Sequence, residues 1–158
     1  MVPHIDGQFL RDVEAVLTAP DRGLGTWVDK TTVTWFKFNH QLAVAIGDIL
    51  QRNFHHAWPT YRMIPVVFKA RWFFLLTVSI EFLYKALPRM HTWDSRHTVT
   101  VWTQFNLVAR TLYRDNMRVL KRGWARGLDK PRWMTTTVWN DLVDMFTEFD
   151  PDDVGFMS

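Results

Sequence analysis

The sequence contains no cysteine, which excludes disulfide bonds, thiolate metal ligands and cysteine nucleophiles. Serine and glutamate are scarce as well, with three of each in 158 residues. None of the serines lies in the Gly-x-Ser-x-Gly setting of a hydrolase nucleophile, and no pair of carboxylates suggests general acid–base catalysis. The only close pair of glycines, Gly23 and Gly25, has no phosphate-loop motif around it. We therefore expect a protein that is not an enzyme and needs no cofactor.

A metal site is also unsupported by the pattern of potential ligands. His91, Asp94 and His97 recur at three-residue spacing and could in principle offer three ligands. They fall at an expected helix boundary, where capping is the more ordinary role of such residues, and no zinc motif accompanies them. We expect no metal site.

Long apolar runs are missing too. The most apolar stretch, residues 63–84, is interrupted by proline and charged residues, and its longest charge-free run covers only residues 72–80. A transmembrane helix needs about 20 apolar residues. The N-terminal sequence MVPHIDGQFL lacks the basic region and apolar run of a signal peptide. We expect an intracellular protein that is neither secreted nor transmembrane.

Charge is distributed unevenly along the chain, although the net charge is only +3. Residues 133–158 contain no basic residue and carry a net charge of −6, and residues 1–29 carry −3. Residues 30–132 between them carry +12. A basic body with acidic ends indicates a polyanionic partner or contact between copies of the chain.

The hydrophobic periodicity predicts an all-α fold of about five helices in a single domain spanning residues 1–158. Residues 1–30 are a candidate extended N-terminal arm, and residues 150–158 are a candidate short C-terminal tail. The expected helices cover residues 6–18, 32–54, 65–87 and 94–126, and a fifth lies between Pro131 and Asp150. Gly127 stands at the position where helices commonly end. Aromatic residues make up 15% of the chain, including nine tryptophans, which indicates large contact surfaces as well as a core.

Three segments rich in threonine and valine leave an alternative open. They are TTVTW at 31–35, TVTVW at 98–102 and TTTVW at 135–139. Alternating β-branched residues favour short strands. Each segment leads into a run with helical periodicity, so we interpret them as first turns of helices that a tryptophan anchors.

The strongest signal is an arginine at every fourth position within RTLYRDNMRVLKRGWAR. On a helix these arginines extend over about 24 Å and sweep about 160° around the axis. The opposite arc is apolar apart from Asn116. Between residues 105 and 132 there are eight bases and two acids, so neighbouring guanidinium groups should repel one another unless anions cover them. We call this set the arginine stripe: Arg110, Arg114, Arg118, Arg122 and Arg126.

Nucleic acid is the polyanion that fits this pattern best. Arginine outnumbers lysine thirteen to six, and its planar fork binds phosphate in bidentate fashion. Such contacts position a protein on a nucleic acid without reading the bases. The candidate contact residues outside the stripe are Lys69, Arg71, Lys121, Lys130 and Arg132. The alternatives are an anionic membrane surface, the acidic C-terminal segment of the same or a neighbouring chain, another acidic protein, and plain solvation of the stripe.

The stretch TVTVWTQFNLVARTLYRDNMRVLKRGWAR and the apolar terminus GFMS resemble coat proteins of rod-shaped or filamentous archaeal DNA viruses. The resemblance is one of character in a helical, cysteine-free, basic and aromatic-rich chain. It implies a virion subunit that wraps double-stranded DNA and assembles with copies of itself or with a similar subunit into a helical filament. It also implies that the arginine stripe faces the duplex, and a lipid envelope is a further candidate partner because some members of that family carry one. The acidic C-terminus departs from the family pattern.

Overall fold

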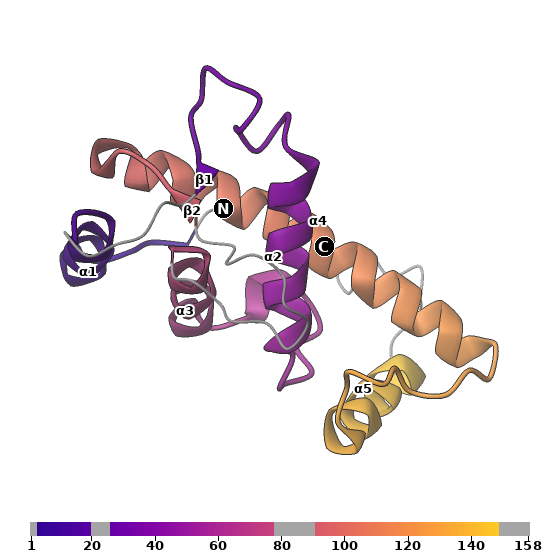
Figure 1. The fold of residues 1–158 in the computed structure, drawn as a ribbon. Coiled ribbons are helices and arrows are strands. Elements are labelled where there is room, and N and C mark those ends of the chain that lie inside the picture. The colour runs from indigo at the N-terminus through magenta and orange to yellow at the C-terminus, as the bar shows by residue number, and fades with distance from the viewer. Residues whose placement is uncertain (1–2, 20–25, 78–90, 149–158) are drawn as a thin grey trace.

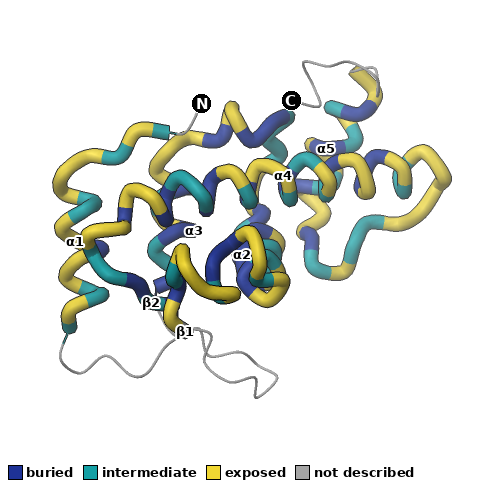
Figure 2. Tube along the Cα trace, turned by 90° about the horizontal axis from the view of Figure 1, so that it is seen from above, coloured by how far each residue is buried: buried dark blue, intermediate teal, exposed yellow. Residues whose placement is uncertain are grey.

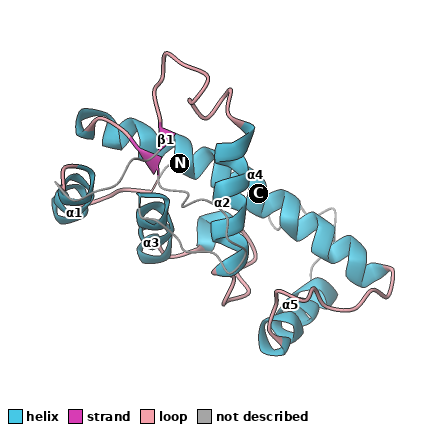
Figure 3. Cartoon of the chain, viewed as in Figure 1, coloured by secondary structure: helices cyan, strands magenta, loops and turns pink. Residues whose placement is uncertain are grey.

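The computed structural model describes residues 3–19, 26–77 and 91–148, and within them nearly all of the regular secondary structure is helical (Figures 1 and 3). This confirms the all-α prediction. The α-helices are α1 (Gly7–Leu17), α2 (His40–Arg52), α3 (Val66–Thr77), α4 (Thr98–Ala125) and α5 (Thr136–Glu148). Two single-turn 3-10 helices, η1 (Tyr61–Met63) and η2 (Ser95–His97), precede α3 and α4. The two-residue strands β1 (Thr26–Trp27) and β2 (His91–Thr92) pair in parallel.

Helix α4 is the axis of the molecule. Its 28 residues extend over about 42 Å. Helices α1, α2 and α3 gather around its first part, whereas α5 lies beside its C-terminal end, away from the other three (Figure 1). The two ends of α4 therefore have very different surroundings.

An aromatic cluster forms the core around the first part of α4. Phe73 on α3 is fully buried, and its ring centroid lies 5.2 Å from that of Trp102 and 5.3 Å from that of Phe105. Phe9 of α1 packs on both Phe73 and Trp102, and the indole nitrogen of Trp102 donates a hydrogen bond to the carbonyl of Pro3. Residues 3–17 are thus part of the core and do not form the extended N-terminal arm that we expected.

Helix α1 begins and α4 ends as the sequence indicates. Asp6 caps α1 by accepting a hydrogen bond from the amide of Phe9. Gly127 adopts a positive φ of 79°, and the amide of Leu128 donates to the carbonyl of Gly123. Together with the bond from the Gly127 amide to the Trp124 carbonyl, this is a Schellman motif. A residue without a Cβ is needed there, which explains the helix end.

The predicted helix over residues 32–54 is wrong at its start, because α2 begins only at His40 and residues 30–38 form turns. Asp29 accepts hydrogen bonds from both the amide and the hydroxyl of Thr31, and Thr32 bonds the carbonyl of Asp29. These local bonds compete with helix formation. Asn39 then caps α2 by accepting from the amide of Leu42. The strand alternative does not hold for this segment either.

The other two segments rich in threonine and valine do open helices, since α4 begins at Thr98 and α5 at Thr136. Asp94 caps the short helix η2 directly before α4. The last part of the helix predicted over residues 65–87, from 78 onward, and the predicted tail at 150–158 lie outside the described residues. None of the helices described is both long enough and apolar enough to cross a bilayer.

Candidate nucleic-acid interface

The arginine stripe lies on the second half of α4, whose first turns still face α2 through Leu112, Tyr113 and Asn116. Arg110, Arg118, Arg122 and Arg126 are exposed, and Arg114 is half-buried. In this part of α4, each helical turn contains both buried and exposed residues (Figure 2). The only α-helix drawn near this end is α5 (Figure 1). The stripe therefore occupies an open side of the molecule.

The stripe stays on that open side because the buried face of α4 turns with it. The buried face contains a second series of residues at four-residue spacing: Phe105, Ala109, Tyr113, Met117 and Lys121. Each of the first four arginines directly follows a member of this series, for example Arg114 after Tyr113. Two series with the same spacing keep a constant angle, here about 100°. The sweep of the stripe therefore never carries an arginine into the core.

Because the buried face rotates along α4, two expectations about this helix are wrong. Val119 is one of the residues of the arc that we expected to be the apolar, packed side of the helix, but it is 64% exposed. Lys121 was assigned to the basic surface, but it is 7% exposed and its ammonium lies 5.9 Å from the ring centroid of Phe146 on α5. A prediction that uses one apolar arc for the whole helix misses both residues. The buried arc of the second half is rotated around the helix axis relative to that of the first half.

Among the described residues, one carboxylate pairs with arginines of the stripe. Asp115 lies 3.6 Å from Nε of Arg114 and 3.8 Å from Nη1 of Arg118. All three side chains are more than a third exposed, so these ion pairs contribute little. No carboxylate of the described residues pairs with Arg110, Arg122 or Arg126. The surface along the stripe is thus strongly positive.

Lys69, predicted as a phosphate contact, lies inside the protein. It is 4% exposed, and its ammonium stands 4.3 Å from the ring centroid of Tyr61. Burial lowers the pKa of Lys69 to about 8, and the face of the tyrosine ring offers partial compensation for the charge. Lys69 is not available to a ligand on the surface.

The remaining predicted contacts divide between two places. Arg132 is exposed and Lys130 is half-buried, and both lie in the loop that follows the last arginine of the stripe. Arg71 is exposed on α3, where its guanidinium stands 5.8 Å from the ring centroid of Phe68. Helix α3 lies at the other end of α4 from α5 (Figure 1). The structure therefore groups Arg132 and Lys130 with the stripe, and Arg71 belongs to a separate surface.

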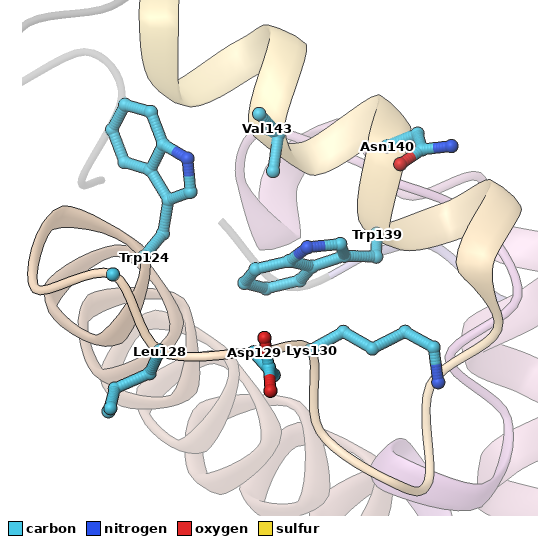
Figure 4. Close-up of a pocket in the computed structure, with 8 residues that line it drawn as sticks. Trp124, Leu128, Asp129, Lys130, Trp139, Asn140 and Val143 are labelled. Carbon is cyan, nitrogen blue, oxygen red and sulfur yellow. The ribbon is translucent and has the colours of Figure 1, made fainter.

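A cleft beside the end of the stripe was not anticipated. It has a volume of about 590 Å³ and lies between the C-terminal turn of α4, the loop after it and α5 (Figure 4). We call it the tryptophan cleft after Trp124 and Trp139; it is also lined by Gly127, Leu128, Asp129, Lys130, Asn140 and Val143. The richness in tryptophan was the only sequence signal for it. Which tryptophans meet depends on how α5 packs, and periodicity does not reveal that.

Asn116, the polar residue within the apolar arc, has a structural explanation. It lines a second cleft of about 450 Å³ between α2 and α4, together with His40, Gln51 and Leu112. Asn106, in contrast, is buried, and it accepts a hydrogen bond from the Tyr61 hydroxyl and donates to the carbonyl of Trp102. Within residues 3–19, 26–77 and 91–148, no three histidine or acidic side chains come together as metal ligands.

Comparison with known proteins gives no relative from which a role could be carried over: no family model, no curated protein and no solved structure matches the chain.

Proposed function

We propose that the protein is a structural subunit that coats double-stranded DNA. The arginine stripe binds the phosphate backbone without regard to base sequence, and further copies of the chain, or a similar subunit, assemble beside it into a filament. In this proposal the protein is a component of a virion. The resemblance to coat proteins of rod-shaped or filamentous archaeal viruses and the charge of α4 support the same conclusion.

The observation that carries the proposal is the uncompensated charge of the stripe. Five arginines stand at steps of about 6 Å along one helix, with Asp115 as their only described counter-charge. Neighbouring arginines at this spacing destabilise a helix in isolation. A phosphate backbone removes that repulsion, and each bidentate arginine–phosphate contact adds charge-assisted hydrogen bonds.

Binding to DNA is tested by its dependence on salt. The full-length protein is titrated with a duplex of mixed sequence at several salt concentrations, and the slope of log K against log[salt] is measured. Each phosphate contact contributes about 0.9 to that slope for duplex DNA. Replacing two arginines, as in Arg118→Ala with Arg122→Ala, should therefore weaken binding and reduce the slope by about 2.

A matched control is available within the chain. Arg11 on α1 and Arg62 on η1 are also exposed and lie outside the stripe. Replacing both with alanine removes the same amount of charge and should leave the slope unchanged. If both double variants changed the slope equally, net charge alone would explain DNA binding and the stripe would have no specific role. Electron microscopy of the protein with DNA tests assembly, because a coat subunit should form helical filaments.

A second candidate, binding to an anionic membrane surface, rests on apolar side chains that accompany the stripe. Leu107, Val119 and Leu128 are 46%, 64% and 56% exposed on or just after α4. Basic and apolar groups together are typical of proteins that lie on anionic bilayers. Sedimentation with vesicles containing phosphatidylserine separates the candidates, since a membrane protein binds the vesicles and ignores the duplex. A protein that ignores both would fit the third alternative, an adaptor for an acidic protein.

A further inference from the structure

The tryptophan cleft has a rigid aromatic lining. Phe146 of α5 packs on both tryptophans, with its ring centroid 5.7 Å from Trp124 and 6.5 Å from Trp139. Figure 4 shows the Trp139 indole across the middle of the cleft, with Val143 on one side and Asp129 and Lys130 on the other. Both indoles are half-buried, so each still presents surface to a ligand. The cleft volume of about 590 Å³ falls in the range of small-molecule sites.

Three polar side chains of the cleft lack a partner among the described residues. Lys130 offers a cation, Asn140 offers a donor and an acceptor, and Asp129 offers a carboxylate; none of them forms a hydrogen bond or an ion pair within the described chain. Flat apolar surface combined with unused polar groups suits a ligand that is itself a flat polar ring. The Asp129 carboxylate suits an amino group on such a ring.

The lining of the cleft contains one base, Lys130, and one acid, Asp129, and further bases flank the lining residues in the sequence. Arg126, the last residue of the arginine stripe, directly precedes Gly127 in the cleft wall, and exposed Arg132 follows Lys130 by two residues. The acids of α5, namely Asp141, Asp144 and Glu148, are exposed but do not line the cleft. A strand bound along the stripe as far as Arg126 is therefore one residue from the cleft wall, and Lys130 is the base of the lining that an anionic group can pair with.

From these observations we propose that the tryptophan cleft binds an unpaired nucleotide, with its base stacked on Trp139 and its phosphate at Lys130. The inference rests on the proposed function, because the DNA strand that enters the cleft is the one bound along the stripe. It extends that function from the backbone of a duplex to an unpaired base at an end, a gap or a single-stranded stretch. Stacking on an indole accepts any base, so this site adds affinity with little sequence preference.

The test uses the full-length protein with two probes, a ten-nucleotide oligothymidylate and a blunt-ended duplex of mixed sequence. Binding is followed by fluorescence anisotropy of the labelled DNA and by quenching of tryptophan fluorescence. Base–aromatic stacking of ordinary strength predicts that Trp139→Leu binds the oligothymidylate about 5- to 150-fold more weakly. The blunt duplex should be bound as before, because the stripe is intact.

Trp27→Leu is the matched control, because Trp27 is 50% exposed on β1 and lies outside the cleft. Equal affinity of Trp139→Leu and Trp27→Leu for the oligothymidylate overturns the inference while the salt dependence of duplex binding still stands. Conversely, a strong effect of Trp139→Leu with no salt-dependent duplex binding supports the cleft and removes the role of the stripe.

Trp139 is half-buried, so its replacement can also loosen α5. Thermal melting by circular dichroism checks this, and Lys130→Ala provides a second variant that leaves the packing of α5 intact. For single strands each phosphate contact adds about 0.7 to the salt slope. Lys130→Ala should reduce the slope for oligothymidylate by about that amount, and an unchanged slope contradicts the inference even if Trp139→Leu fails to fold.

Discussion

The two halves of α4 differ in charge and in the helices that surround them. The first half, residues 98–109, contains no charged residue and is surrounded by α1, α2 and α3. The second half, residues 110–125, carries four arginines of the stripe, with the fifth at the C-cap. It faces α2 around Leu112 and Tyr113 and has α5 at its end. One continuous helix thus connects a dry aromatic core to a charged surface.

The comparison separates the part of α4 that contributes most to stability from the part for which we propose a role in binding DNA. Burial of large aromatic side chains around the first half supplies the free energy of folding. The second half keeps a helical conformation in spite of like charges, because its apolar side also packs: Tyr113 stacks on Phe54, and Trp124 packs on Phe146 of α5. Its charges contribute little to folding, which is consistent with a role that appears only when a polyanion is bound.

The largest expected effect concerns the core. Phe73→Ala removes a fully buried ring that contacts Phe9, Trp93, Trp102 and Phe105, and should reduce the free energy of unfolding by about 3 to 5 kcal/mol. Arg118→Ala on the second half should change it by less than about 0.5 kcal/mol. Urea unfolding followed by tryptophan fluorescence measures both. Similar losses in the two variants would remove the distinction between the halves.

The next effect is a dependence of stability on pH. Burial lowers the pKa of Lys69 to about 8 from 10.5, so between these values the unfolded chain holds more protons than the folded protein. Stability should therefore rise with pH, by about 2 kcal/mol between pH values of about 7.5 and 9.5. Chemical unfolding at several pH values measures the rise. Lys69→Met is the control that should abolish it, and a rise that persists in this variant would assign it to other groups.

A smaller effect is expected where the second half ends. Gly127→Ala places a Cβ at a φ of 79° and should destabilise the protein by about 1 to 2 kcal/mol. Gly123→Ala, four residues earlier and inside the helix, should stabilise it by about 0.5 to 1 kcal/mol, because the nearest atom to the added Cβ is at an ordinary 3.6 Å. Thermal melting compares the two, and effects of the same sign would contradict the helix end described above.

The smallest change in stability is expected within the stripe. Arg122→Glu puts an acid four residues from both Arg118 and Arg126, but this gain opposes the cost of an acid in the last turn of α4, so stability should change by less than about 0.5 kcal/mol. The same variant should bind duplex DNA more weakly than Arg62→Glu, which lies outside the stripe. A loss of binding without a comparable loss of stability separates a ligand surface from an ordinary solvated helix. A loss of stability in Arg122→Glu would instead show that Arg122 supports the fold.

The comparison also shows which features of the fold could be predicted from the sequence. The N-cap Asp6, the helix end at Gly127 and the continuity of α4 were predictable, because each depends on a few neighbouring residues. Residues 31–35 were not, because the hydrogen bonds of Asp29 and Thr32 outweigh a helical pattern of apolar side chains. Lys69 and Lys121 were placed on the surface by their charge, although partners brought by η1 and α5 hold them inside.

The sequence by itself determined that five arginines share one helix, because a repeat of four residues and the helical pitch of 3.6 are local properties. Only the tertiary structure decided which side of that helix is open and that two tryptophans from α4 and α5 meet beside its end. The physical reason is that hydrogen bonding along a helix is set by adjacent residues. Burial, in contrast, depends on which distant helices pack against each face.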